Sequence, residues 1–221
     1  MIRIDRDAYK FIATLLFIGA ACFVLYLLSG SAAPLAGTVL CVIGILYCAY
    51  FFRDPDRSVP NEPGVLISPA DGLIVDIADI DADGFENGTA RRIAVFMNVF
   101  NVHVNRSPMD GRVAGLKHRN GKKLSAYNKR AEYENEHSEI DFVTEQGPVR
   151  VRQIAGLVAR RVVTRLEPGD TVERGGRIGL IRFGSRVDVL FPTTFTPAVQ
   201  VGEKTRAGET VIARYTMKPE G

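Results

Sequence analysis

The longest uncharged stretch of the chain limits its fold more than any other feature. Residues 11–52 contain no Asp, Glu, Lys or Arg. The segment SGSAAP (29–34) divides this stretch into two apolar runs, 11–28 and 35–52, of 18 residues each. As helix, 18 residues extend about 27 Å, which just spans the hydrocarbon layer of a bilayer. We therefore expect an N-terminal hydrophobic helical hairpin that either crosses the bilayer or is embedded in one leaflet.

The charges that flank the apolar stretch predict its orientation. Arg3, Arg6 and Lys10 precede it, and Arg53 and Arg57 follow it. Positive residues favour the cytoplasmic side of a membrane, so we expect both ends of the hairpin on the cytoplasmic face of the cell membrane. A cleaved signal peptide would be shorter and would lack a second apolar run of equal length.

The segment RDPDRSVPNEPG (53–64) contains helix-ending prolines and a glycine, and it predicts a short linker. We therefore divide the chain into a membrane-associated hairpin with its flanks (1–57) and a second domain (58–221). From residue 65 onward, short β-branched runs bounded by Gly, Pro, Asn or Asp predict strands, among them RRIAVFMNVFNVHVN (91–105). The segment 122–137 is the single plausible helix, but it lacks a clean apolar stripe and could equally be an ordered loop. The expected fold class is mainly β.

Two segments with matching glycine spacing refine this expectation. PGDTVERGGRIGLI (168–181) and VGEKTRAGETVIA (201–213) each place two glycines six residues apart. Such turn and strand units resemble the barrel-sandwich hybrid domains that carry biotin or lipoate. A carrier needs a modifiable lysine at a hairpin tip, whereas the only Met-Lys pair, at 217–218, follows the last predicted strand. A membrane-tethered carrier or adaptor is therefore retained only as an alternative.

Composition and cysteine usage exclude two classes of function. The net charge of +3 argues against a nucleic-acid binder. The three cysteines all lie in the apolar stretch, without metal-ligand spacing to a histidine. We expect them to be reduced packing residues, and we expect no metal site.

The three histidines are candidates for acid–base chemistry. His118 and His137 lie among charged residues and are expected at the solvated surface. His103 differs, because strand alternation would place it on one face with Asn101 and Asn105. It is either a hydrogen-bonded histidine of the sheet or a catalytic one.

A serine hydrolase is a second alternative. Ser185, His103 and Asp71 could form a catalytic triad, with Asp71 at the turn SPADG (68–72) that opens a strand. The residues around the serine are FGSRV, however, and these do not form a Gly-x-Ser-x-Gly elbow.

Four motifs together resemble one known family. SPADG, FMNVFNVHVNRSPMDG (96–111), NEH (135–137) and FGSRVDVLFP (183–192) occur in the order and spacing of phosphatidylserine decarboxylase proenzymes, particularly the short bacterial and archaeal branch. The similarity covers essentially the whole chain, including the apolar hairpin. The resemblance implies an enzyme that converts a membrane phospholipid, phosphatidylserine, into phosphatidylethanolamine and CO2.

The resemblance also implies a cofactor made from the chain itself. Family members cleave themselves between a glycine and a serine, here Gly184 and Ser185. Ser185 would become an N-terminal pyruvoyl group, which binds the substrate amine as a Schiff base without an external cofactor. Chains 1–184 and 185–221 would remain associated as a heterodimer, and a higher oligomer is left open.

Two further roles follow from matching positions in the family. His103 matches the central histidine, with an expected role in proton delivery to the substrate or in support of self-cleavage. Asp71 matches the aspartate of the family's Ala-Asp-Gly motif, which is expected to orient or activate a base during maturation.

The chain also departs from the family pattern. Longer members carry a second histidine three positions after the first, where this chain has Arg106. They usually have Leu-Gly-Ser-Thr at the cleavage site, where this chain has Phe183 and Arg186. These departures leave open which histidine completes a maturation triad with Asp71 and Ser185.

Two residues that follow the central histidine are candidates for substrate binding. Arg106 is expected either to contact the lipid phosphate or to form a surface salt bridge. Asn105, beside it, is the second candidate.

Overall fold

The computed structural model describes residues 2–122, 134–156, 162–182 and 185–216. It contains two compact units, Met1–Asp56 and Arg57–Gly221. The first contains both long helices, and the second contains most of the strands.

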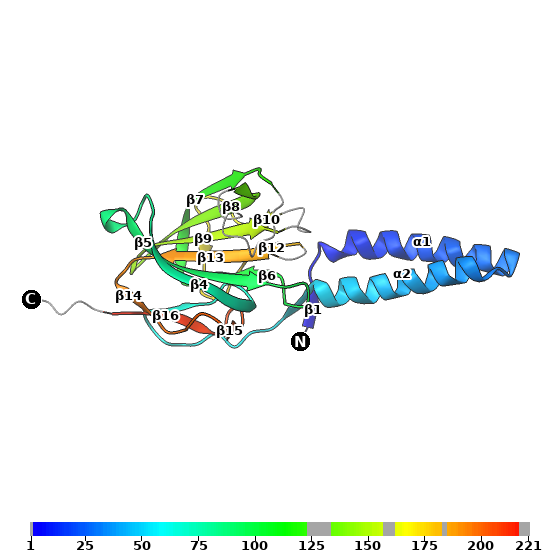
Figure 1. Ribbon diagram of the computed structural model, residues 1–221, viewed down its shortest axis with the longest axis horizontal. Coiled ribbons are helices and arrows are strands. Elements are labelled where there is room, and N and C mark those ends of the chain that lie inside the picture. Colours follow the sequence, from blue (N-terminus) through cyan, green and yellow to red (C-terminus); the bar gives the residue numbers. More distant parts are fainter. Residues whose placement is uncertain (1, 123–133, 157–161, 183–184, 217–221) are drawn as a thin grey trace, which may run out of the picture. The chain divides into compact units, whose positions relative to one another are not determined.

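The N-terminal unit is a pair of antiparallel helices closed by a short strand pair (Figure 1). Helix α1 (Ala8–Ser29) and helix α2 (Ala32–Phe51) correspond to the two predicted apolar runs. Gly30 lies between them in the left-handed conformation (φ 64°). Strand β1 (Ile2–Ile4) pairs with β2 (Arg53–Pro55) at the open end. Both helices are long and apolar enough to cross a membrane, and only 6% of each apolar window is buried. The predicted apolar helical hairpin is thus confirmed.

Small residues allow α1 and α2 to pack closely. A Cβ atom on Gly19 would lie 3.1 Å from the Cβ atom of Cys41, and one on Gly37 would lie 3.1 Å from the sulfur of Cys22. Glycine at such positions lets helix backbones approach, which is how apolar helices associate where water supplies no driving force. Two of the three cysteines therefore lie in the contact between the helices.

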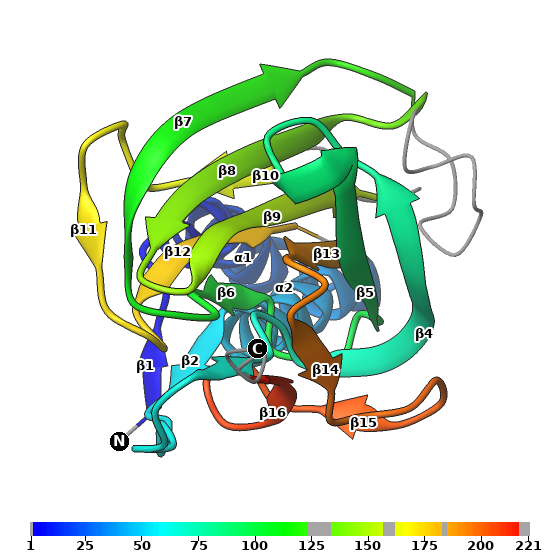
Figure 2. The same cartoon turned by 90° about the vertical axis from the view of Figure 1, so that its left-hand side faces the viewer.

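The described residues of the second unit form three antiparallel sheets, and the mainly β expectation is confirmed. Its largest sheet has the strand order β11-β7-β8-β9-β13-β5-β4-β15 and curls around the core (Figure 2). Two three-stranded sheets, β10-β12-β6 and β14-β16-β3, complete the unit. The strands, with one 3-10 turn, are β3 (Val65–Ile67), β4 (Gly72–Asp81), η1 (Glu86–Gly88), β5 (Thr89–Met97), β6 (Val104–Arg106), β7 (Gly111–Arg119), β8 (His137–Thr144), β9 (Gly147–Ala155), β10 (Val162–Thr164), β11 (Thr171–Val172), β12 (Arg177–Ile181), β13 (Ser185–Phe191), β14 (Phe195–Pro197), β15 (Lys204–Thr205) and β16 (Val211–Tyr215).

The core of this unit is mainly aliphatic. Ile93, Val95, Val151, Val187 and Val189 lie on the three central strands and are fully buried. Their alternation along β5, β9 and β13 follows the period of two that directs side chains to opposite faces of a strand.

The two glycine-rich segments form equivalent units, as their spacing predicted. Each contains a two-residue strand followed by a turn and a longer strand, β11 with β12 and β15 with β16. Their four glycines, Gly169, Gly175, Gly202 and Gly208, all have positive φ, which a residue with a Cβ rarely adopts. Strands β11 and β15 form the two edges of the large sheet.

The predicted strand over 91–105 is wrong in its second half. Strand β5 ends at Met97, and the next strand begins at Val104. The backbone N–H of Phe100 donates a hydrogen bond to the Asn98 side chain at 2.9 Å. The backbone N–H of Asn98 donates to the Asn101 side chain, also at 2.9 Å. Such side-chain bonds to the local backbone compete with a strand ladder and favour a turn. The predicted helix over 122–137 lies mostly at 123–133, outside the described residues.

Candidate active site

Ser185 is the first residue of the central strand β13. It lies between Met97 at the end of β5 and Ala155 at the end of β9, and it is fully buried. Strand β12, which ends four residues earlier at Ile181, belongs to a different sheet. The strand that ends before Ser185 and the strand that begins at Ser185 therefore belong to different sheets. Gly184 and Phe183, the predicted cleavage position and its neighbour, lie outside the described residues.

The Ser185 hydroxyl has a weak hydrogen-bond acceptor. It donates to the sulfur of Met97 at 3.5 Å, and the Asn105 side-chain nitrogen donates to the same sulfur at 3.7 Å. A thioether accepts hydrogen bonds poorly, so little energy holds the hydroxyl in this position. Met97, Asn105 and Ser185 are all fully buried.

A chain of buried polar side chains continues from Asn105. Gln153 on β9 donates from its Nε2 to Asn105 Oδ1 at 2.8 Å, and the Thr164 hydroxyl donates to Gln153 Oε1 at 3.1 Å. The hydroxyls of Thr164 and Ser138 lie 2.9 Å apart. Both line a pocket of about 270 Å³ that also includes His118. Polar groups thus connect the neighbourhood of Ser185 to this pocket.

Asp71 lies immediately before β4, as predicted, and it is bound to two partners. Arg57 Nη2 donates to its two carboxylate oxygens at 2.9 and 3.0 Å, and the backbone N–H of Ala207 donates to Oδ1 at 2.8 Å. Within the described part of the chain, Asp71 has no hydrogen bond with His103 or Ser185. The structure therefore does not bring the three predicted catalytic residues into a connected triad.

His103 is buried, with 2% of its surface exposed, and it directly precedes β6. In the pairing of β6 with β12, Val104 lies opposite Leu180. Extending this antiparallel register by one residue places His103 beside Ile181, where the chain leaves β12 toward Ser185. Asn101 and His103 do not share a strand with Asn105, so the predicted common face is not formed by a strand.

Arg106 and Arg186, the two arginines that differ from the family pattern, are both buried. Arg106 donates to the carbonyl oxygen of Gly175 at 3.0 Å and is 6% exposed, so its side chain is buried rather than at the surface. Arg186 donates through Nε and Nη2 to the two carboxylate oxygens of Asp188 at 2.6 and 2.8 Å. This paired geometry neutralises both charges beside Ser185.

The prediction that His137 lies at the solvated surface is wrong. The histidine is 8% exposed rather than solvated, and its Nδ1 lies 2.9 Å from the carbonyl oxygen of Asn135. Asn135 is fully buried and donates to the carbonyl oxygen of Ala155 at 2.7 Å. The motif NEH thus supports Ala155, the residue paired with Ser185. His118 is exposed as predicted, with 43% of its side chain accessible.

Sequence reasoning missed Gln153, although the chain contains a signal for it. Val149 and Val151 point into the core, and Gln153 occupies the next inward position of the same strand. A polar side chain at an inward position is buried and needs hydrogen-bond partners. Met97 carried no such signal, because methionine is an ordinary core residue.

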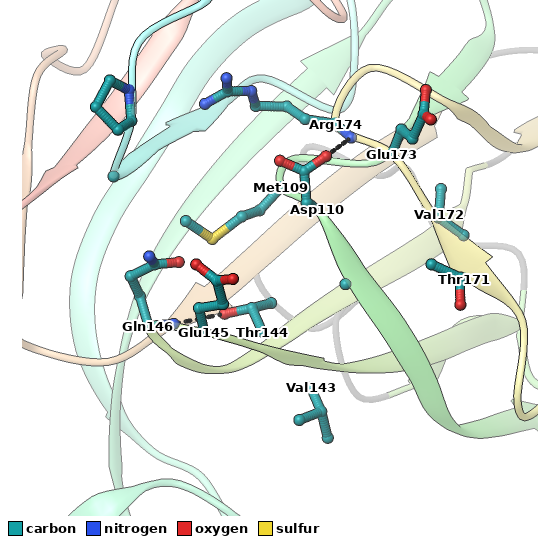
Figure 3. Close-up of a pocket in the computed structure, with 13 residues that line it drawn as sticks. Met109, Asp110, Val143, Thr144, Glu145, Gln146, Thr171, Val172, Glu173 and Arg174 are labelled. Carbon is teal, nitrogen blue, oxygen red and sulfur yellow. Dashed lines mark hydrogen bonds between the residues drawn. The ribbon is translucent and has the colours of Figure 1, made fainter.

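One pocket lies away from Ser185. It has a volume of about 510 Å³ and includes carboxylates from three separate segments, Asp110, Glu145 and Glu173 (Figure 3). Glu145 precedes the first residue of β9, whereas Ala155 beside Ser185 is its last. Nine strand residues separate the two ends by about 26 Å. Among the described residues no cluster of His, Cys, Asp and Glu could hold a metal ion.

Comparisons with known proteins assign a family to this arrangement. Residues 45–213 match the model of a family described as phosphatidylserine decarboxylase. The chain is 45% identical over 199 residues to the phosphatidylserine decarboxylase proenzyme of Desulfotalea psychrophila, covering 90% of this chain and 92% of that protein. It is 45% identical to the proenzyme of the same name from Oleidesulfovibrio alaskensis (81% and 84% covered). The corresponding protein of Chlorobium chlorochromatii is 44% identical (79% and 82% covered).

Proposed function

This chain belongs to the phosphatidylserine decarboxylase family, and from that premise we propose that Ser185 provides a pyruvoyl group for its reaction. The proposed reaction converts phosphatidylserine into phosphatidylethanolamine and CO2. The observation that carries the proposal is the position of Ser185, which is fully buried at the start of a central strand and four residues after the end of a strand of another sheet.

Self-cleavage begins at the Ser185 hydroxyl. Its oxygen adds to the carbonyl carbon of Gly184, the C–N bond breaks, and an ester with a free amine at residue 185 results. Elimination then removes the proton from Cα of residue 185 and breaks the bond between Cβ and the ester oxygen, which forms a Cα=Cβ double bond and leaves Gly184 with a carboxylate. Addition of water at Cα and loss of ammonia convert the remaining enamine into a ketone. The weak bond to Met97 favours the first step, because little energy is lost when the hydroxyl turns away.

The surroundings of Ser185 fit a pyruvoyl group. Its side chain faces the Met97 sulfur, an apolar neighbour suited to the methyl group that the Cβ atom would become. Such a group supplies a ketone that captures the substrate amine and accepts electrons when CO2 leaves. The residues that would hold it are Met97, Asn105 and the backbone of Ala155.

The two chains formed by cleavage would stay together. Residues 185–216 contribute β13, β14, β15 and β16. Strand β13 lies between β5 and β9, β15 pairs with β4, and β16 pairs with β3. All of these partner strands precede residue 184, so four ladders connect the small chain to the large one in a heterodimer.

His103 is the proposed proton donor to the substrate carbon that has lost CO2. Its burial beside the end of β12 supports this role, because the chain reaches Ser185 from that strand. Asp71 is the proposed supporting residue in maturation, acting from the start of β4, whose neighbour β5 pairs with Ser185. The lipid contacts expected of Asn105 and Arg106 remain predictions.

The two apolar helices support a membrane-bound enzyme. A diacyl phospholipid does not partition into water, so anchoring to the bilayer brings the domain to its substrate. The basic flanking residues support the cytoplasmic face as its location.

A product assay tests the proposed reaction against both alternatives. The purified full chain in detergent is mixed with phosphatidylserine labelled at the serine carboxyl group, and CO2 and lipid products are measured. We expect labelled CO2 and an equal amount of phosphatidylethanolamine. A serine hydrolase would instead release fatty acid or a water-soluble headgroup, and a carrier or adaptor would leave the lipid unchanged. Either of these results would overturn the proposal.

A further inference from the structure

Asn105 and Ser185 direct their side chains to the same buried atom. Both donate to the Met97 sulfur, Asn105 through Nδ2 at 3.7 Å and Ser185 through its hydroxyl at 3.5 Å. Since sulfur is a weak acceptor, the Asn105 Nδ2 group forms only a weak hydrogen bond there. A buried donor of this kind beside a reacting atom is preorganised to stabilise negative charge that develops during reaction.

The orientation of the Asn105 carboxamide follows from its neighbours. Thr164 donates to Gln153 Oε1 at 3.1 Å, which leaves Gln153 Nε2 to donate to Asn105 Oδ1 at 2.8 Å. With Oδ1 occupied, Nδ2 faces the sulfur. The reverse orientation would place a carbonyl oxygen against a thioether, and neither atom could donate a hydrogen bond.

We propose that the Asn105 carboxamide donates a hydrogen bond to the reacting group at position 185, and that Gln153 is the positioning residue that fixes its orientation. The inference rests on the proposed function, because it concerns the formation and use of a reacting group at Ser185. During self-cleavage the carbonyl oxygen of residue 184 gains negative charge, and its carbon is bonded to the Ser185 nitrogen. A donor beside Ser185 stabilises that charge.

Gln153→Glu tests the orientation directly. A carboxylate can still accept from Thr164, but it cannot donate to Asn105 Oδ1. Asn105 would then turn its Nδ2 toward residue 153 and present an oxygen to Ser185. The side chains of Asn105 and Thr164 and the backbone of Gly179 lie around Gln153, and none of them is ionisable. The new carboxyl would therefore have a raised pKa, and its protonated form would donate as glutamine does.

The expected result is a loss of rate that acid reverses. At neutral pH the rates of self-cleavage and of product formation per cleaved chain should fall by about 10- to 100-fold in Gln153→Glu, with KM little changed. As the pH is lowered, the ratio of the variant rate to the wild-type rate should return toward one. A merely structural role would not give this recovery. Asn105→Asp, which loses the donor itself, should be slower still.

Two further variants keep the test decisive. Thr164→Val, on the short strand β10, removes the hydroxyl that donates to Gln153 and contacts the Ser138 hydroxyl. It leaves Asn105 and Gln153 in place, so it should fold and slow cleavage by about 3- to 10-fold. Ser107→Ala removes a buried hydroxyl that donates to the Met109 carbonyl oxygen at 2.7 Å, and it should match the wild type.

The outcomes separate this inference from the proposed function. If the wild type neither cleaves nor forms product, the proposed function fails. If the wild type does both and Gln153→Glu and Asn105→Asp match it at neutral pH, only the inference is overturned. Should those two variants not fold, a Thr164→Val protein with wild-type rates would overturn it equally.

Discussion

Ser185 and Met97 lie opposite each other on adjacent strands, and the serine hydroxyl donates to the methionine sulfur at 3.5 Å. Because this bond is weak, we expect Ser185→Ala to change the free energy of unfolding by less than about 1 kcal/mol. The same substitution should prevent self-cleavage completely, since it removes the attacking oxygen. Thermal unfolding and intact-mass measurement of the variant test both expectations. A cleaved Ser185→Ala chain would contradict them.

Substitutions of the two partners in the Arg57–Asp71 ion pair can distinguish a structural role of Asp71 from a chemical one. Their side chains are 7% and 15% exposed, so Asp71→Asn and Arg57→Gln should each lower the free energy of unfolding by about 1–3 kcal/mol. If Asp71 supports maturation, only Asp71→Asn should slow self-cleavage, by at least about tenfold. Two measurements on freshly made precursor of each variant, the rate of self-cleavage and the unfolding curve, decide whether Asp71 supports maturation. Equal cleavage rates in the two variants would assign Asp71 a structural role only.

His103→Gln should impair the reaction on the substrate. Loss of a proton donor is expected to lower product formation per cleaved chain by about 10²- to 10⁴-fold. The cleaved fraction is determined by mass and the product by lipid analysis, so that maturation and turnover are scored separately. His118→Gln is the matched control, because His118 has 43% of its side chain exposed and should be replaceable without effect. Wild-type turnover per cleaved His103→Gln chain would exclude the proposed donor.

Asp79 gives the β domain a pH-dependent contribution to stability. Hydrogen bonds from Arg91 at 2.7 and 2.9 Å lower the pKa of Asp79 below its ordinary value of 3.8. A carboxyl with a lowered pKa stabilises the fold above its unfolded pKa, and that contribution is lost as the pH falls through its folded pKa. Asp79→Asn should therefore lower Tm at pH 7, and the difference should shrink below about pH 4.

The size of this effect is limited by solvent. Asp79 has 48% of its side chain exposed, so the contribution at neutral pH should stay below about 1 kcal/mol. Asp81→Asn, on the same strand, is the matched control, because Asp81 forms no ion pair in the described part of the chain. A Tm difference for Asp79→Asn that grows in acid would have the wrong sign for this account.

Features governed by local sequence could be predicted. The two apolar runs form helices of a length and hydropathy that could cross a membrane, where a segment must satisfy its backbone hydrogen bonds internally. The repeated glycine spacing predicted equivalent turns because four positions require positive φ. The strand break at Asn98 was missed because alternation of apolar residues continues through the turn. There, side-chain bonds to the backbone outweigh the pattern.

Relationships between distant residues could not be predicted from one sequence. Asp71 is bound by Arg57 and by the N–H of Ala207, which lies 136 positions away. His137 was placed at the surface because its neighbours are charged, yet it begins a strand whose pairing buries it. Of the candidate site residues, Ser185 and His103 were found through motifs. Gln153 carried a signal in its inward position on β9, but its partners Asn105 and Thr164 became visible only when three strands were placed together.

The central claim is that one peptide bond is broken to convert Ser185 into a ketone. Denaturing mass analysis of the active wild-type protein, with and without hydroxylamine treatment, tests it most directly. We expect two chains, residues 1–184 and 185–221, and the smaller should lack a free amine and gain mass on reaction with hydroxylamine. Fully active protein consisting of one uncut chain that does not react with hydroxylamine would contradict the claim.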